Sequence, residues 1–291
     1  MIESGMLQNI LSFGPVFLLI AARAFAMIQT APLLSSDAIP MAARMALAGL
    51  AAFAALPTSE VYLAADEASG IITLPGGTLS DLRYETFSLR FGLLLIGEAV
   101  IGIIIGFYMT IIFAAFSTAG QFFSLQMGFG ASETFDPVAQ IENPLMGQYF
   151  NLVSMVIFVT IGGFHQLFLG GFWRSVQTIN IISLINGREP VVTMIVSGLS
   201  RLFMDAIIIA LPILGTLFLT SLTTGLISKA APQINILSEG FPISILTAFM
   251  LLLASLPFMI EAFTRVIDSG FSSFQTLYTQ IGRQITSGGG Y

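Results

Sequence analysis

Long, almost uninterrupted apolar stretches dominate this sequence and restrict what it can fold into. An α-helix needs roughly 20 apolar residues to cross the hydrocarbon core of a bilayer, and six stretches approach or exceed that length: Ile10–Ala31, Ala38–Leu56, Leu89–Phe116, Leu145–Phe172, Val191–Ile227 and Ile243–Phe263. Only 9% of the residues are charged, against about 25% in soluble domains. The sequence therefore predicts an all-α membrane protein with about six long, partly kinked helices arranged as hairpins.

Two of these regions are longer than one membrane crossing. A straight helix over Val191–Ile227 would cover about 55 Å, whereas the hydrocarbon core measures roughly 30 Å. Pro212 and Gly215 lie near its middle and predict a kink or a break. The region Leu89–Met127 poses the same problem. We therefore expect these helices either to bend back or to lie partly outside the bilayer, against other protein.

The residues that usually carry chemistry are scarce. The sequence has no cysteine and a single histidine, His165, so it cannot assemble a thiolate or histidine-based metal cluster. It contains no Walker loop and no GxGxxG motif, and its ten basic residues are scattered rather than gathered into a nucleic-acid patch. We expect no enzyme activity, no metal or other cofactor, and no nucleic-acid partner.

Several charged residues interrupt the apolar stretches, where each is costly unless it is paired. Arg23 lies in the first stretch. Arg201 and Asp205 are four residues apart and share a helix face, which suits either a local ion pair or a proton or ion relay. Glu98 has no partner nearby in the sequence, so it would be protonated, paired across helices or hydrated. Structural and functional roles both stay open for these buried charges.

Glycines surround Glu98 at short intervals, at positions 92, 97, 102 and 106. Small residues repeated along one membrane helix allow a second helix to approach closely. This pattern predicts a helix–helix contact in the third apolar stretch.

The segment Gly120–Pro137, "GQFFSLQMGFGASETFDP", combines aromatic side chains with flexible glycines. A bendable segment cannot face lipid with its backbone groups unsatisfied, so it should be buried in protein or line a cavity. Two interpretations remain. It is either a helix–loop junction folded onto the helices, or a deformable stopper in a conduit, because apolar constrictions gate by excluding water.

The polar hairpin Gly225–Pro242, "GLISKAAPQINILSEGFP", holds the only lysine, Lys229. Physical reasoning alone predicts a turn bounded by two helix-stopping residues, Pro232 and Pro242. The hairpin also resembles the C-terminal signature of the FliR family of flagellar export-gate proteins, which is related to the SctT (YscT, SpaR) proteins of virulence type III secretion. The matching residues are Gly225, Leu226, Lys229, Ala231, Pro232, Gln233, Asn235, Gly240, Phe241 and Pro242.

Two further matches support this resemblance. One lies between Ala119 and Pro137. The matching residues there are Ala119, Gly120, Gln126, Met127, Gly128, Phe135, Asp136 and Pro137. The other is the Gly97–Glu98 pair. The sequence departs from the family pattern at two positions. The family often has Arg where this chain has Lys229, and the residue before Gly-Phe-Pro is acidic here, Glu239. Neither departure alters the resemblance.

The resemblance implies a fold, a function and partners. It implies a FliP-like part over residues 1–190, a FliQ-like helical hairpin over 191–270 and a tail over 271–291. Such a chain would join FliP-like and FliQ-like subunits in an export gate for unfolded flagellar proteins, with FlhB-like and FlhA-like proteins nearby. It would reside in the bacterial inner membrane, in the flagellar basal body. A virulence SctT homologue is the first alternative, and a small-solute secondary transporter the second.

The resemblance also implies roles for particular residues. A loop over about 121–137 would plug the pore through Gln121, Phe122, Phe123, Leu125, Met127, Phe129 and Phe135. The hairpin would contact neighbouring subunits through Lys229, Pro232, Gln233, Asn235, Phe241 and Pro242. Hydrophobic side chains of this kind can seal around many substrates, because dispersion contacts are not directional.

Overall fold

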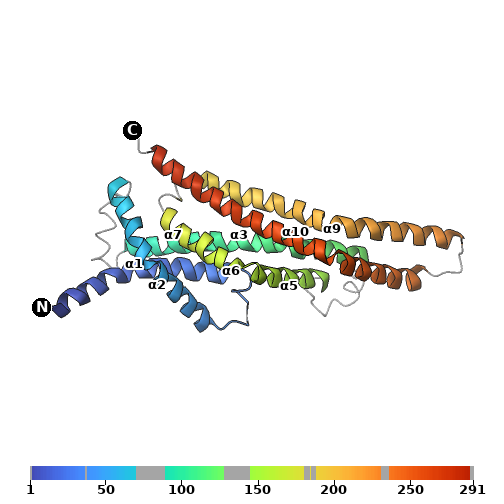
Figure 1. The fold of residues 1–291 in the computed structure, drawn as a ribbon, viewed down its shortest axis with the longest axis horizontal. Coiled ribbons are helices and arrows are strands. Elements are labelled where there is room, and N and C mark those ends of the chain that lie inside the picture. Colours follow the sequence, from blue (N-terminus) through green and yellow to red (C-terminus); the bar gives the residue numbers. More distant parts are fainter. Residues whose placement is uncertain are drawn as a thin grey trace. The chain divides into compact units, whose positions relative to one another are not determined.

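The computed structural model describes residues 2–36, 38–69, 89–127, 145–179, 184, 188–230 and 236–288. Within these ranges the secondary structure is helical, without strands (Figure 1). The elements, in chain order, are α1 (Ile2–Thr30), α2 (Met41–Ser69), α3 (Leu89–Met127), α5 (Leu145–Thr160), α6 (Gly163–His165), the π-helix η2 (Gln166–Trp173), α7 (Arg174–Thr178), α9 (Arg188–Ala230) and α10 (Ile236–Gly288).

Four of the described helices are long and apolar enough to cross a membrane: α2 over Met41–Thr58, α3 over Phe91–Met127, α9 over its whole length and α10 over Pro242–Ile281. The bent pair formed by α5 and the helical segment after it counts as a fifth. In α1, the apolar part Gly14–Thr30 is shorter than a full crossing. The predicted all-α membrane class is confirmed.

The predicted continuous helix over Leu145–Phe172 is wrong. The helix α5 ends at Thr160, the next helical segment begins at Gly163, and the two are bent by 75°. Gly162 adopts φ +73° at the break. Only glycine enters this left-handed region without steric cost, and glycine there commonly ends a helix.

Prolines do not interrupt the two longest helices. The helix α9 has 43 residues and continues through Pro212. Of the kink or break predicted there, the break is therefore wrong. The helix α10 has 53 residues and includes Pro242 and Pro257, so Pro242 does not stop a helix as expected. A proline lacks the amide that would bond the carbonyl four residues earlier, which for Pro212 is the carbonyl of Ile208. Apolar helices tolerate this loss when other groups satisfy the freed carbonyl.

The chain divides into two compact units that are not continuous in sequence. Unit 1 comprises Met1–Thr110, Gly163–Val196 and Gly270–Tyr291, and unit 2 comprises Ile111–Gly162 and Ser197–Ser269. The helices α3, α9 and α10 therefore each contribute to both units. The expected tail after residue 270 begins as part of α10, and Phe274, Tyr278 and Ile281 are buried. The division into FliP-like and FliQ-like parts at residue 190 stays a prediction.

Glycines allow close helix contacts inside each unit. In unit 1, a Cβ on Gly102 would clash with the Arg23 carbonyl of α1, and one on Gly106 would clash with the Thr30 hydroxyl. In unit 2, a Cβ on Gly120 would lie 2.7 Å from the Cα of Gly147 in α5. The helix contact predicted from the glycine pattern is thus present at Gly102 and Gly106. Gly92, by contrast, has nothing within 4 Å of such a Cβ.

Candidate functional site

A buried polar cluster joins three segments of unit 1. The Arg23 guanidinium of α1, which is only 2% exposed, donates from Nε to Glu98 Oε2 of α3 over 2.6 Å. Its Nη1 donates to the Ser175 hydroxyl over 3.2 Å, and its Nη2 donates to the Ile179 carbonyl over 2.8 Å. We call Arg23, Glu98, Ser175 and the Ile179 carbonyl the arginine cluster. Each of its charges is paired and hydrogen-bonded, as a buried charge must be.

The sequence left three possibilities for Glu98: protonation, pairing across helices or hydration. In the structure, Glu98 is paired across helices with Arg23. Arg23 and Glu98 were both recognisable as charges inside apolar stretches, but 75 positions separate them. Sequence spacing could not pair them, because only residues three or four apart are certain to meet on a helix. Ser175 and the Ile179 carbonyl gave no signal in the sequence.

In the part of the chain that the structure describes, no salt bridge joins Arg201 directly to Asp205. Arg201 is exposed in the chain and donates a 2.7 Å hydrogen bond to the Ser269 hydroxyl of α10, while Asp205 is half-buried. The prediction that both charges are buried is therefore corrected. Besides Arg23 with Glu98, the ion pair found among the described residues joins Arg265 to Glu261 over 2.9 Å, and these two side chains are 73% and 70% exposed.

The segment expected to form a plug loop begins as helix. The helix α3 continues to Met127, so Gln121, Phe122, Phe123, Leu125 and Met127 are helical. This corrects the loop conformation expected from residue 121. The last turns of α3 pack against α5, which approaches closely at Gly120, and burial of Phe123 and Met127 favours a continuous helix there. Phe129 and Phe135 lie outside the described residues.

The helical part of this segment has an inner and an outer side. Phe123 and Met127 are fully buried, and the Phe123 ring lies 4.9 Å from the Phe150 ring of α5. Leu125 is 69% exposed, and Gln121 and Phe122 are half-buried. The proposed plug residues therefore divide into a pair that packs within unit 2 and a set that reaches its surface.

Aromatic rings link three helices of unit 2. The Phe263 ring of α10 lies 4.3 Å from the Phe116 ring of α3 and 5.9 Å from the Phe150 ring of α5. The Phe113 ring lies 5.4 Å from the Phe158 ring. Tilted and edge-to-face pairs of this kind stabilise a core without hydrogen bonds. We call these rings, with Phe123, the aromatic cluster.

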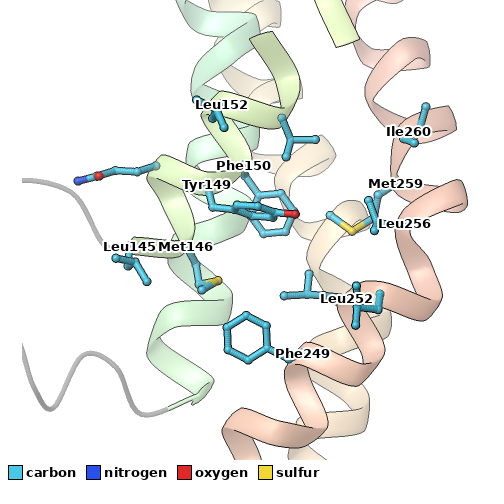
Figure 2. Close-up of a pocket in the computed structure, with 13 residues that line it drawn as sticks. Leu145, Met146, Tyr149, Phe150, Leu152, Phe249, Leu252, Leu256, Met259 and Ile260 are labelled. Atoms are coloured by element: carbon cyan, nitrogen blue, oxygen red, sulfur yellow. The ribbon is translucent and has the colours of Figure 1, made fainter. Parts of the chain in front are cut away.

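An apolar cavity of about 620 Å³ lies beside the aromatic cluster, between α5 and α10. Figure 2 shows the Tyr149 and Phe150 rings of α5 directed toward Leu256 and Met259 of α10, with Phe249 at one end. The lining supplies few polar groups and no charged side chain. It can accept apolar groups by shape, but it offers no acid, base or nucleophile beyond the Tyr149 phenol.

The residues predicted for subunit contact lie around the α9–α10 connection. Lys229 is exposed in the last turn of α9, where a cation is favoured by the helix dipole. Pro232, Gln233 and Asn235 lie outside the described residues. Phe241 and Pro242 lie within α10 rather than in a turn. The connector is therefore shorter than the sequence suggested.

Sequence reasoning missed the π-helix η2 and its buried hydrogen bond. The Tyr278 hydroxyl of α10 donates to the Gly171 carbonyl over 2.7 Å. Two adjacent glycines, Gly170 and Gly171, were the only local signal. Within the described ranges, no group of three His, Cys, Asp or Glu residues is placed to hold a metal ion.

Comparison with known proteins extends over nearly the whole chain. The family described as "Bacterial export proteins, family 1" matches residues 15–270. Flagellar biosynthetic protein FliR of Borreliella burgdorferi is 32% identical over 197 residues, covering 66% of this chain and 73% of the relative. Flagellar biosynthetic protein FliR of Bacillus subtilis is 25% identical over 278 residues, covering 95% and 99%.

A relative with a different name also matches. Surface presentation of antigens protein SpaR of Shigella sonnei is 29% identical over 190 residues, covering 65% of this chain and 71% of the relative. Because the family match spans far more than half of the sequence and the described helices are those of a membrane protein, this chain belongs to family 1 of the bacterial export proteins, the FliR family that its C-terminal hairpin resembles.

Proposed function

We propose that this chain is the FliR-type subunit of a bacterial type III export gate that passes unfolded flagellar proteins through the inner membrane. One structural observation carries the proposal. Large apolar side chains are exposed along α9 from Val192 to Ile227, a distance of about 53 Å at 1.5 Å per residue. The hydrocarbon core is only about 30 Å thick.

Lipid alone cannot cover an apolar surface of that length. An exposed apolar patch of this size on a protein marks an interaction surface. We therefore assign part of the α9 surface to contacts with other subunits, namely FliP-like and FliQ-like proteins in a hetero-oligomer. Contacts with FlhB-like and FlhA-like proteins, and a place in the flagellar basal body, are part of this proposal and rest on the family resemblance of the hairpin.

The sealing role is assigned to the end of α3 and the residues that follow. Phe122 and Leu125 direct apolar groups outward from the packed pair Phe123 and Met127. A dry ring of such groups excludes ions when idle and deforms around a passing chain. The protein has no catalytic role in this scheme, and it needs no cofactor.

Co-purification tests the subunit assignment. An affinity-tagged chain should retain FliP-like and FliQ-like proteins in stoichiometric amounts after membrane extraction. A small-solute transporter would purify alone and bind or move a solute. Recovery of the chain without these subunits would refute the proposal. Complementation separates the two secretion branches: restored motility in a fliR-deficient strain supports the flagellar assignment, and restored virulence secretion alone supports the SctT alternative.

Ion conductance tests the seal. Leu125→Ser, alone and with Phe122→Ser, should raise conductance of the assembled gate, because a hydroxyl lets water into the constriction. Leu93→Ser is the matched control, since Leu93 is also an exposed leucine and lies near the other end of the same helix, α3. Conductance equal to that of the unmodified gate would remove the end of α3 from the seal.

Lys229→Glu tests the predicted contact at the α9–α10 connection. Reversal of this exposed charge should reduce co-purification of a neighbouring subunit and lower secretion. Unchanged co-purification and secretion would leave Lys229 with no role beyond capping α9.

A further inference from the structure

The segment Gly163–Thr178 is unusual because its middle is a π-helix. The stretch η2 runs over eight residues, Gln166–Trp173, whereas π-helical bonding is mostly confined to single-turn bulges and is frequent at functional sites. The two glycines inside it weaken any regular helix, because glycine costs about 1 kcal/mol relative to alanine there. Something outside the segment must therefore stabilise this form.

Hydrogen bonds at the end of η2 combine a π-type bond with a 3₁₀-type bond at one residue. The Arg174 amide donates to the Leu169 and Gly171 carbonyls, which lie five and three residues earlier. An α-helix would direct that amide to the carbonyl four residues earlier. The backbone is thus held between two bonding patterns at this residue.

Tyr278 supports the π-helical pattern from outside the segment. Its hydroxyl donates to the Gly171 carbonyl over 2.7 Å, one of the carbonyls that Arg174 also uses. The ring itself is stacked on Phe274, with centroids 6.3 Å apart. The donor is therefore held in place by the packing of α10.

The arginine cluster fixes the other end of the segment. Ser175 accepts from Arg23 and donates to the Phe172 carbonyl over 2.6 Å, and Ile179 accepts a second Arg23 donor. A change from five-residue to four-residue bonding in η2 would shift the chain by one residue and rotate the following side chains by about 100°. Ser175 and the Ile179 carbonyl would then leave Arg23.

We propose that Gly163–Thr178 is a two-position register switch, held in its π-helical position by Tyr278 at one end and by the arginine cluster at the other. In the second position η2 adopts α-helical bonding, and both contacts are lost together. The two contacts are discrete and cannot be half made, which is the property of a bistable element. The inference concerns unit 1 alone and does not depend on the proposed export function.

Hydrogen exchange of the purified full-length chain in detergent tests the proposal. Tyr278→Phe removes only the hydroxyl at one end. Ser175→Ala removes one of the two Arg23 contacts at the other end, together with the Ser175 bond to the Phe172 carbonyl. If one equilibrium links both ends, each variant alone should raise the exchange rate of amides in both 166–173 and 174–179, by about fivefold for one lost hydrogen bond. If Tyr278→Phe affects only the first stretch and Ser175→Ala only the second, or if neither has an effect, the switch is refuted.

Matched controls come from the same chain. Tyr108 is also buried and packs on Phe274, at 5.0 Å between centroids, so Tyr108→Phe removes a hydroxyl near the same ring. Ser154 is buried and donates to its own helix, so Ser154→Ala is the control for Ser175→Ala. Equal effects from the controls would overturn the proposal.

The unmodified chain provides a measurement that does not depend on variants. A single opening event predicts equal protection factors, within about threefold, for the slowest amides of 166–173 and 174–179. Clearly different protection in the two stretches would show that they open independently, and it would overturn the switch even if a variant fails to fold.

Discussion

In unit 1 a buried guanidinium joins α1, α3 and the end of α7 through directed hydrogen bonds, whereas in unit 2 the facing helices meet through phenylalanine rings. Directed bonds between buried charges tolerate little displacement, because each lost partner leaves a charged group unpaired. Ring contacts lose energy gradually when they shift. Unit 1 is therefore suited to discrete geometries that are made or lost as a whole, as in the proposed register switch, and unit 2 is suited to adjust its packing gradually.

Removal of one partner of the arginine cluster should have the largest effect. Arg23→Met leaves Glu98 buried without its counter-ion, and we expect the free energy of unfolding to fall by about 3–5 kcal/mol. The double variant Arg23→Met/Glu98→Leu should recover most of that loss, because no charge remains buried. The fluorescence of Trp173, the only tryptophan, reports unfolding in detergent. A double-variant loss equal to the sum of the single losses would contradict this explanation.

Close helix contact in unit 1 should be the next most sensitive feature. Gly102→Ala places a methyl group against the Arg23 carbonyl, and overpacking of this kind costs about 1–3 kcal/mol. Gly92→Ala is the matched control in the same helix, because nothing lies within 4 Å of its added Cβ. Thermal unfolding followed by circular dichroism compares the two, and equal midpoints would refute the contact.

The aromatic cluster should be more tolerant of conservative change. Phe123→Leu keeps an apolar group of similar size against Phe150, so the free energy of unfolding should fall by less than about 1.5 kcal/mol. The same detergent unfolding experiment measures it. A loss as large as that of Arg23→Met would mean that the two units do not differ in the way argued above.

The smallest effect is expected where the same ion-pair chemistry lies in solvent. Arg265 and Glu261 are 73% and 70% exposed, and an exposed pair four residues apart contributes about 0.5 kcal/mol or less. Arg265→Met in the purified chain should therefore change the unfolding midpoint only slightly. It is the matched control for Arg23→Met, and a comparable loss from both would show that burial is not what makes the Arg23 pair important.

Several features of the fold were predictable because they depend on local composition. Apolar length predicted the membrane helices, and glycine spacing predicted the contact at Gly102 and Gly106. The break at Gly162 was not foreseen, since a glycine inside an apolar stretch is also compatible with a continuous helix. Pro212 and Pro242 were expected to interrupt helices. Both helices nevertheless continue through these residues, because the loss of one backbone donor does not by itself end a long apolar helix.

The candidate site was predictable in part. The sequence alone marked Arg23 and Glu98 as costly charges and Phe123 and Met127 as unusual apolar residues beside glycines. It also contained the hairpin motif around Lys229 that resembles the FliR family. These are properties of single residues and short spacings, which do not change with folding.

Only the tertiary structure decided which of these residues meet. Arg23 donates hydrogen bonds to Glu98, Ser175 and the Ile179 carbonyl, which are all far from it in the sequence. Tyr278 donates to the Gly171 carbonyl, 107 positions away. The sequence determined that buried charges need partners and that apolar helices need cover. Which partner each one takes depends on helix packing, because long-range contacts are set by the arrangement of whole helices rather than by local spacing.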